Sequence, residues 1–128
     1  MRISFSKPAF IELIKANIKP HTIRVDRTNR WQAGKAIQFW FGNPRNVNAK
    51  VKPFQFGIGT CSHVEKIEIN LQRDTVLIGS RTINTTSELN TLAVKDGFAD
   101  WHQMKAFFAN ETGMFYGKII YWQNCTWL

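Results

Sequence analysis

One segment of the chain, residues 54–69, has the character of a β-strand yet is unusually long for one. Strands in globular proteins usually have about 3–10 residues. Gly57 and Gly59 interrupt the segment, and a glycine inside a strand is typical of a bulge or a bend. The segment therefore predicts a β-rich fold with a bend at these glycines.

Shorter segments supply the other elements. Strand character recurs at residues 2–5, 21–25, 35–42, 75–78 and 115–122. Helical spacing puts four apolar residues on one face, namely Phe10, Leu13, Ile14 and Ile18. Ser6 as N-cap and Pro8 suit the start of that helix, and two more helices are expected from Ser87 and from Asp100, the last ending at Gly113. We expect an α+β fold, a small mixed β-barrel of about five or six strands with flanking helices.

The bulk composition suits one domain over residues 1–128, since 44% of its 128 residues are hydrophobic. The first five residues lack the apolar core of a secretion signal, and no run has the length of a membrane span. Cys61 and Cys125 do not make a disulfide framework and suit reduced thiols. We expect a cytoplasmic protein with no membrane association.

Positive charge is concentrated in one part of the chain. The net charge is +8, and residues 19–52 hold a single acid, Asp26, against eight basic residues: Lys19, Arg24, Arg27, Arg30, Lys35, Arg45, Lys50 and Lys52. Such a region can attract polyanions, but it can also be a solvated charged face. The loop at residues 43–53 has the same two interpretations, a phosphate-contacting arm or a simple connection.

A compact polar group lies at the start of the strand at residues 21–25, in the sequence Lys19-Pro20-His21-Thr22-Ile23-Arg24. Alternation along a strand puts Thr22 and Arg24 on one face, with Ile23 and Val25 on the core face. Lys19 would point the other way, so it can join Thr22 only if Pro20 breaks the strand between them. The alternative is that all three polar residues are ordinary surface residues.

Four motifs in order carry a family likeness: Lys19-x-x-Thr22-Ile23-Arg24, Trp31-x-x-Gly34, Asp96-Gly97-Phe98 and Gly117-Lys118-Ile119-Ile120. Together they resemble the ASCH domains of the PUA-like superfamily. The resemblance implies a β-barrel with flanking helices, a cleft on one side, and RNA or a modified nucleoside as partner.

A more distant likeness is to the bacterial N4-acetylcytidine amidohydrolases, in which a lysine, a threonine and a glutamate are catalytic. These roles fall on Lys19, Thr22 and Asp96. Aspartate here is one methylene shorter than the glutamate, and catalysis is sensitive to shifts of about an ångström. Asp96 beside Gly97 also suits a turn or a helix cap.

Three functions follow from these residues. In a binding domain, Arg24 would offer its donor fork to a phosphate or a base edge, with Arg27, Arg30 and Lys35 nearby. Trp31 and Trp40 could stack on a base, although core packing is the favoured interpretation of both. The alternatives are an amidohydrolase acting on an N4-acylated cytidine, and a protein-interaction module without a small ligand.

Metal and cofactor chemistry find no support in the sequence. Cys61 and His63 are two residues apart, but no second ligand pair has the spacing of a zinc site. Neither a P-loop nor a dinucleotide-binding glycine motif is present. We expect no metal and no cofactor.

Overall fold

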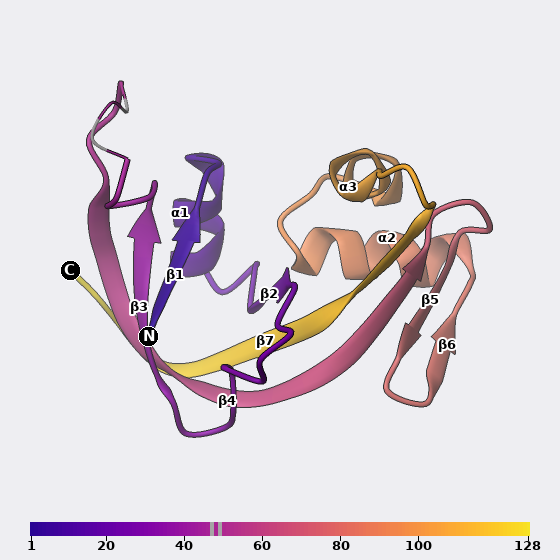
Figure 1. Ribbon diagram of the computed structural model, residues 1–128, viewed down its shortest axis with the longest axis horizontal. Coiled ribbons are helices and arrows are strands. Elements are labelled where there is room, and N and C mark those ends of the chain that lie inside the picture. The colour runs from indigo at the N-terminus through magenta and orange to yellow at the C-terminus, as the bar shows by residue number, and fades with distance from the viewer. Residues whose placement is uncertain (47, 49) are drawn as a thin grey trace.

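The computed structural model describes every residue of the chain except Val47 and Ala49, and its centre is the long strand expected from the sequence. This strand, β4 (Phe54–Asn70), has 17 residues and pairs antiparallel with β7 (Met114–Trp127). The register shifts between Ile58 and Thr60 and again between Cys61 and His63. Figure 1 shows the two strands curving together beneath the other elements, so the predicted bend is confirmed.

The glycines permit the close pairing of the start of β4 with the end of β7. A Cβ atom on Gly57 would lie 2.4 Å from the Trp127 ring, and one on Gly59 would lie 2.9 Å from the Cys125 sulfur. Real Cβ atoms do not approach other atoms so closely. The Trp127 indole can therefore lie against β4 only because residue 57 has no side chain.

Five shorter strands extend the sheet on both sides of the β4–β7 pair. On one side of β4, β3 (Ala36–Phe41) and then β1 (Arg2–Phe5) follow its first half, and β5 (Thr75–Ile78) and β6 (Arg81–Ile83) follow its second half. The seventh strand, β2 (His21–Arg24), pairs with the far edge of β7.

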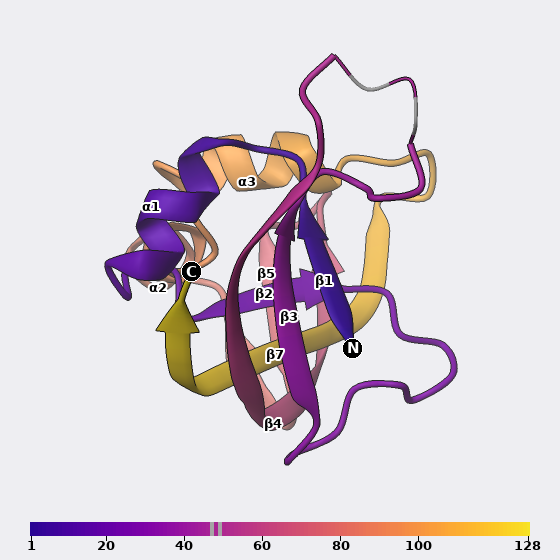
Figure 2. The same cartoon turned by 90° about the vertical axis from the view of Figure 1, so that its left-hand side faces the viewer.

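The sheet is mixed but is not closed, so the expected barrel is not confirmed. Strand β1 pairs parallel with β3 and β2 pairs antiparallel with β7, but no ladder joins β1 to β2 among the described residues. Figure 2 shows the reason, since β2 runs across the direction of β1 and β3. The α+β class is confirmed, with seven strands where about five or six were expected; the three-residue β6 has no counterpart among the predicted segments.

Three helices lie on the concave side of the curved sheet (Figure 1). Helix α1 (Ala9–Lys15) follows Pro8 without a side-chain cap, so the cap predicted at Ser6 is wrong. Thr85 caps α2 (Thr86–Lys95), so Ser87 lies inside that helix instead of starting it. Asp100 caps α3 (Trp101–Phe108) as predicted, because its carboxylate accepts the Gln103 amide at 2.9 Å.

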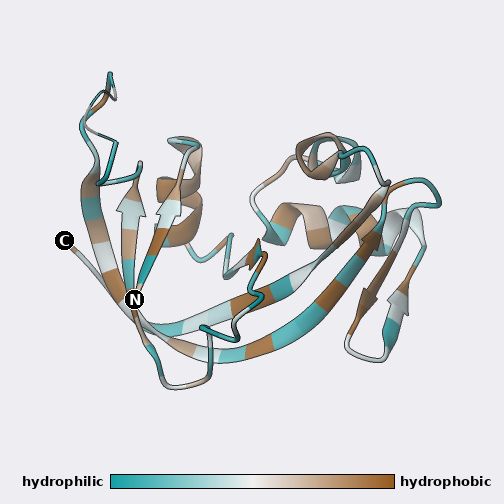
Figure 3. Cartoon of the chain, in the orientation of Figure 1, coloured by the Kyte–Doolittle hydropathy of each residue, from teal (hydrophilic) through white to brown (hydrophobic). Residues whose placement is uncertain are grey.

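The apolar residues of the sheet and the helices form one buried cluster. Figure 3 shows the cause, since hydrophobic and hydrophilic residues alternate along β4 and β7. Val25 departs from its predicted place in the core; it lies beyond the end of β2 and is 52% exposed. No helix in the described part of the chain is long and apolar enough to cross a bilayer.

The loop expected at residues 43–53 connects β3 to β4. Val47 and Ala49 within it lie outside the described residues. Its role as a phosphate-contacting arm therefore stays a prediction.

Candidate functional site

A turn between α1 and β2 carries Lys19 into the interior. Asn17 has a left-handed backbone with φ 59°, and the amides of Ile18 and Lys19 both donate to the Leu13 carbonyl, at 2.9 and 3.0 Å. Pro20 then separates this turn from β2. The turn removes the alternation of a continuous strand, and Lys19 and Thr22 line the same cavity. Pro20 thus breaks the strand between Lys19 and Thr22, which is the condition under which the two side chains can share one site.

This cavity has a volume of about 300 Å³ and is called the phenylalanine cavity below. Its polar wall includes the three residues predicted to be catalytic and the arginine predicted to bind ligand: Lys19, Thr22, Asp96 and Arg24. Its apolar wall is made of five aromatic rings: Phe5, Phe10, Phe98, Phe107 and Phe108. Figure 1 shows the elements that supply these residues, with α1 and β1 on one side, α3 on the other and β2 between them.

Lys19 and Asp96 form a buried ion pair at this polar wall. The Lys19 ammonium donates to the Asp96 carboxylate at 3.1 Å and to the Asp96 backbone carbonyl at 2.6 Å. The two side chains are only 2% and 4% exposed. Asp96 is also the C-cap residue of α2, so the capping interpretation and the site interpretation both apply to it. The ammonium lies 4.6 Å from the centre of the Phe10 ring, which adds a cation–π contact.

Burial opposes the charge on both members of this pair. It lowers the pKa of Lys19, against the pull of the Asp96 charge. It raises the pKa of Asp96 to about 6, although the neighbouring Lys19 charge acts in the opposite direction. Buried ion pairs contribute little to stability compared with apolar side chains, and strongly perturbed groups concentrate at functional sites.

Arg24 and Thr22 form the second half of the polar wall. The Arg24 Nε donates to the Thr22 hydroxyl at 3.2 Å, and Nη2 donates to the Ser4 carbonyl of β1 at 2.6 Å. These bonds confirm that Thr22 and Arg24 share a face of β2. They also leave the hydroxyl proton of Thr22 available to a ligand, because the oxygen accepts from Arg24. In the described part of the chain, no hydrogen bond joins Lys19 to Thr22.

His21 is a buried neighbour of this group to which the sequence gave no role. Its ring is 2% exposed and lies 3.5 Å from the Asp96 carboxylate, measured from Nε2. Neither ring nitrogen has a hydrogen-bond partner among the described residues. Burial, with a smaller contribution from the Lys19 charge, lowers the pKa of His21 to about 3, so the ring is neutral at pH 7.

The other residues predicted to bind ligand lie outside the cavity. Trp31 is buried in the core and 4% exposed, which leaves its ring covered. Trp40 is half-buried on β3, where its indole donates to the Gln38 side chain at 3.3 Å. Arg27, Arg30 and Lys35 are exposed. In place of the predicted basic cleft, the structure has an aromatic cavity with two cations in its wall, Lys19 and Arg24.

The cavity walls are the part of the site that the sequence did not reveal. Phe5 and Phe10 were expected only in a strand and on a helical core face, while Phe98 was part of a motif. In the structure, Phe10 packs edge-on against Phe5 and Phe98, with ring centroids 6.3 and 5.8 Å away. No sequence spacing could have joined Phe98 to the two N-terminal rings, because the fold alone brings them together.

A second and wider hollow, of about 580 Å³, lies on another face around Val25, Arg27 and Tyr116. Its buried acid, Asp26, is already satisfied, because it accepts the backbone amides of Arg30 and Trp31 and lies 3.6 Å from Lys118. The phenylalanine cavity is therefore the better candidate, since it joins the buried Lys19–Asp96 pair to the Thr22 hydroxyl and the Arg24 guanidinium.

Within the described residues, no group of three histidine, cysteine, aspartate or glutamate side chains is placed to hold a metal ion. No family model, curated protein or solved structure matches the chain. The ASCH resemblance therefore stays an expectation that rests on its four sequence motifs.

Proposed function

We propose that the protein binds a modified pyrimidine nucleoside, free or as part of RNA, in the phenylalanine cavity. The observation that carries this proposal is the convergence of Lys19, Thr22, Arg24 and Asp96 on a space walled by phenylalanine rings. Nucleobases are flat and apolar on their faces and polar at their edges, and proteins hold them by aromatic stacking and edge hydrogen bonds. The volume of about 300 Å³ is at the small end of ligand pockets, which suits one nucleoside.

The polar wall offers both donors and acceptors to a base edge. Two of the three Arg24 guanidinium nitrogens bond within the protein, which holds the group in place and leaves Nη1 as a donor. Thr22 contributes a hydroxyl proton, and Asp96 contributes a second carboxylate oxygen. Lys19 fixes the orientation of Asp96 by its two hydrogen bonds. An exocyclic amide on a pyrimidine has one carbonyl and one N–H, and this set matches both.

The ASCH resemblance supports the same ligand class, because PUA-like domains engage RNA or modified bases. We include in this proposal the closure of the sheet into a PUA-like barrel, in which β1 and β2 are the two edges that approach each other. The hydrogen bond from Arg24 on β2 to the Ser4 carbonyl on β1 is the contact that supports this meeting.

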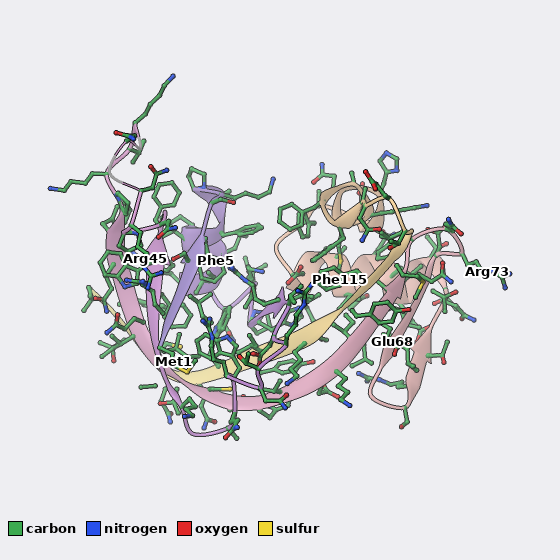
Figure 4. The ribbon with its side chains drawn as sticks, in the orientation of Figure 1. Met1, Phe5, Arg45, Glu68, Arg73 and Phe115 are labelled. Carbon is green, nitrogen blue, oxygen red and sulfur yellow. The ribbon has the colours of Figure 1, made fainter. Side chains whose placement is uncertain are left out.

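The test is the affinity of the purified protein for N4-acetylcytidine and for cytidine, measured by calorimetry. We expect N4-acetylcytidine to bind more tightly than cytidine. Arg24→Gln should weaken binding by about tenfold, the usual effect of losing a charge-assisted hydrogen bond. Arg73→Gln is the matched control, because Arg73 is exposed and lies at the opposite end of the molecule from Phe5 (Figure 4). Equal effects of the two substitutions, or no binding of either nucleoside, would reject the proposal.

A second function, hydrolysis of the N4-acyl group, is favoured by one specific observation. Lys19, Thr22 and Asp96 all line the cavity, and burial lowers the pKa of Lys19, as a lysine general base requires. The Thr22 oxygen would attack the acyl carbon while its proton passes to the Lys19 amine. That proton would then move to the departing N4 of cytosine. Water would hydrolyse the threonyl ester and release the carboxylic acid.

This reaction needs Lys19 first to pass one proton to the Asp96 carboxylate and then to turn as a neutral amine towards Thr22, because the ammonium donates to Asp96 in the structure. Chromatography of N4-acetylcytidine incubated with the protein tests it. We expect cytidine and acetate to form, and Thr22→Val, which keeps the shape of the side chain, to stop their formation. Absence of turnover, or turnover by Thr22→Val equal to that of the wild type, would leave binding as the function.

A further inference from the structure

A third hollow, distinct from the wide one around Tyr116, adjoins the phenylalanine cavity and is strongly basic. It has a volume of about 400 Å³ and is lined by Met1, Arg2, Ser4, Arg30, Asn43 and Arg45. We call it the arginine hollow. Three of its six residues are arginines and none is an acid. It shares Ser4 and Asn43 with the phenylalanine cavity, so the two spaces are neighbours.

The three arginines come from separate parts of the chain. Arg2 is in β1, Arg30 lies between β2 and β3, and Arg45 follows β3. Local bonds set the backbone of two of them, since Asp26 accepts the Arg30 amide at 2.9 Å and Asn43 accepts the Arg45 amide at 3.0 Å. Figure 4 shows Arg45 at the same end of the molecule as Phe5. The fold, and not a run of basic sequence, brings these charges together.

In the part of the chain that the structure describes, their guanidinium groups face no counter-charge. Among the described residues, none of the three arginines has a carboxylate within salt-bridge distance, and none of their side chains donates a hydrogen bond. Three cations around one hollow repel one another, and an anion placed between them would relieve that repulsion. Guanidinium forks bind phosphate oxygens in pairs of hydrogen bonds, which makes phosphate the best-matched anion.

We propose that the arginine hollow is a phosphate subsite, so that the ligand of the phenylalanine cavity is a nucleotide and not a free nucleoside. This inference rests on the proposed function, because it places the base in the phenylalanine cavity. The phosphate of a nucleotide is separated from its base by one sugar, and Ser4 and Asn43 lie where that sugar would pass between the two spaces. The phosphate can belong to a mononucleotide or to an RNA strand.

The test compares three probes: N4-acetylcytidine, its 5′-monophosphate, and a short single-stranded RNA that contains one N4-acetylcytidine. Calorimetry at low ionic strength gives the affinity of each. We expect the monophosphate to bind about tenfold more tightly than the nucleoside, through charge-assisted hydrogen bonds. A further gain with the RNA would identify a strand as the source of the phosphate, and no gain would identify a mononucleotide.

Two single substitutions locate the effect. Arg2→Gln and Arg45→Gln should each reduce the preference for the monophosphate by about threefold or more and leave nucleoside affinity unchanged, because exposed charges each contribute modestly. Arg73→Gln removes the same charge at the far end of the molecule and should leave the preference intact. All three residues are exposed, so the variants should fold.

The outcomes separate this inference from the proposed function. If the nucleoside and the monophosphate bind equally, or if Arg73→Gln acts like Arg45→Gln, the phosphate subsite is refuted while the phenylalanine cavity stands. If phosphate-bearing probes bind through Arg2 and Arg45 but Arg24→Gln has no effect, the proposed function fails. If no probe binds, both fail.

Discussion

Replacing Lys19 by methionine should destabilise the protein strongly, because it leaves a buried acid without its partner. Lys19 makes both of its hydrogen bonds to Asp96, at 2.6 and 3.1 Å, and the two side chains are 2% and 4% exposed. Breaking one partner out of a buried ion pair costs about 3–5 kcal/mol. That is a large part of the total stability of a typical domain, which is about 5–15 kcal/mol.

The loss should depend on pH with a defined sign. Asp96 in the folded wild type has a pKa of about 6, above the value of 3.8 for an unperturbed carboxyl, so its contribution to stability declines as the pH rises through 6. Without Lys19 the pKa of Asp96 rises further. The folded variant then keeps a proton over a wider range, and the gap to wild type should narrow on acidification by up to about 1.4 kcal/mol per pH unit.

Urea denaturation followed by tryptophan fluorescence measures both effects, at pH 8 and at pH 5.5. The double variant Lys19→Met/Asp96→Asn should recover about 2 kcal/mol of the loss at pH 8, because the uncompensated charge is gone. Lys35→Met is the control, because it makes the same substitution and removes the same charge at an exposed site. It should change stability by less than about 0.5 kcal/mol. A single variant within about 1 kcal/mol of wild type at pH 8, or a double variant no more stable than the single one, would refute the reasoning.

Two more predictions concern other parts of the molecule. Because the pKa of His21 is lowered from 6.5 to about 3, this residue should cost the folded protein about 1.4 kcal/mol per unit as the pH falls below 6.5, against the gain that Asp96 gives below pH 6. In urea titrations at pH 6.5 and 4.5, His21→Phe should therefore gain stability relative to wild type on acidification, whereas the exposed His102→Phe should not; parallel curves for His21→Phe and wild type would contradict the assignment. Gly57→Ala should lower stability by about 1–3 kcal/mol, measured as a lower thermal midpoint, because the new Cβ meets the Trp127 ring at 2.4 Å; an unchanged midpoint would contradict this, since it would mean that the end of β7 moves aside.

The sequence predicted those parts of the fold in which local pattern and tertiary role agree. The strand predicted at residues 54–69 matches β4 to within one residue, and the two glycines in it mark the place where its register shifts. The strand at residues 115–122 was too short, since β7 continues to Trp127 through the polar stretch Gln123-Asn124-Cys125. Sheet closure could not be read at all, because it depends on the direction in which β2 crosses β1.

The sequence indicated the polar residues of the candidate site, but neither their burial nor the aromatic walls around them. Strand geometry placed Thr22 and Arg24 together, and the Pro20 condition for Lys19 was met. Lysine is among the residues least often buried, so the local sequence gave no reason to expect that Lys19 is only 1% exposed. Its partner Asp96 lies 77 residues away, at the end of a helix, where an aspartate has a sufficient local explanation.

The most direct test of the central claim is to map where a nucleoside binds. Backbone amide chemical shifts of the ¹⁵N-labelled protein, recorded during titration with N4-acetylcytidine, report each residue separately. We expect the largest changes in the walls of the phenylalanine cavity, at Thr22, Arg24, Asp96 and Phe98, and no change at Arg73. Changes centred on Tyr116 in the wider outer hollow, or no saturable change anywhere, would contradict it.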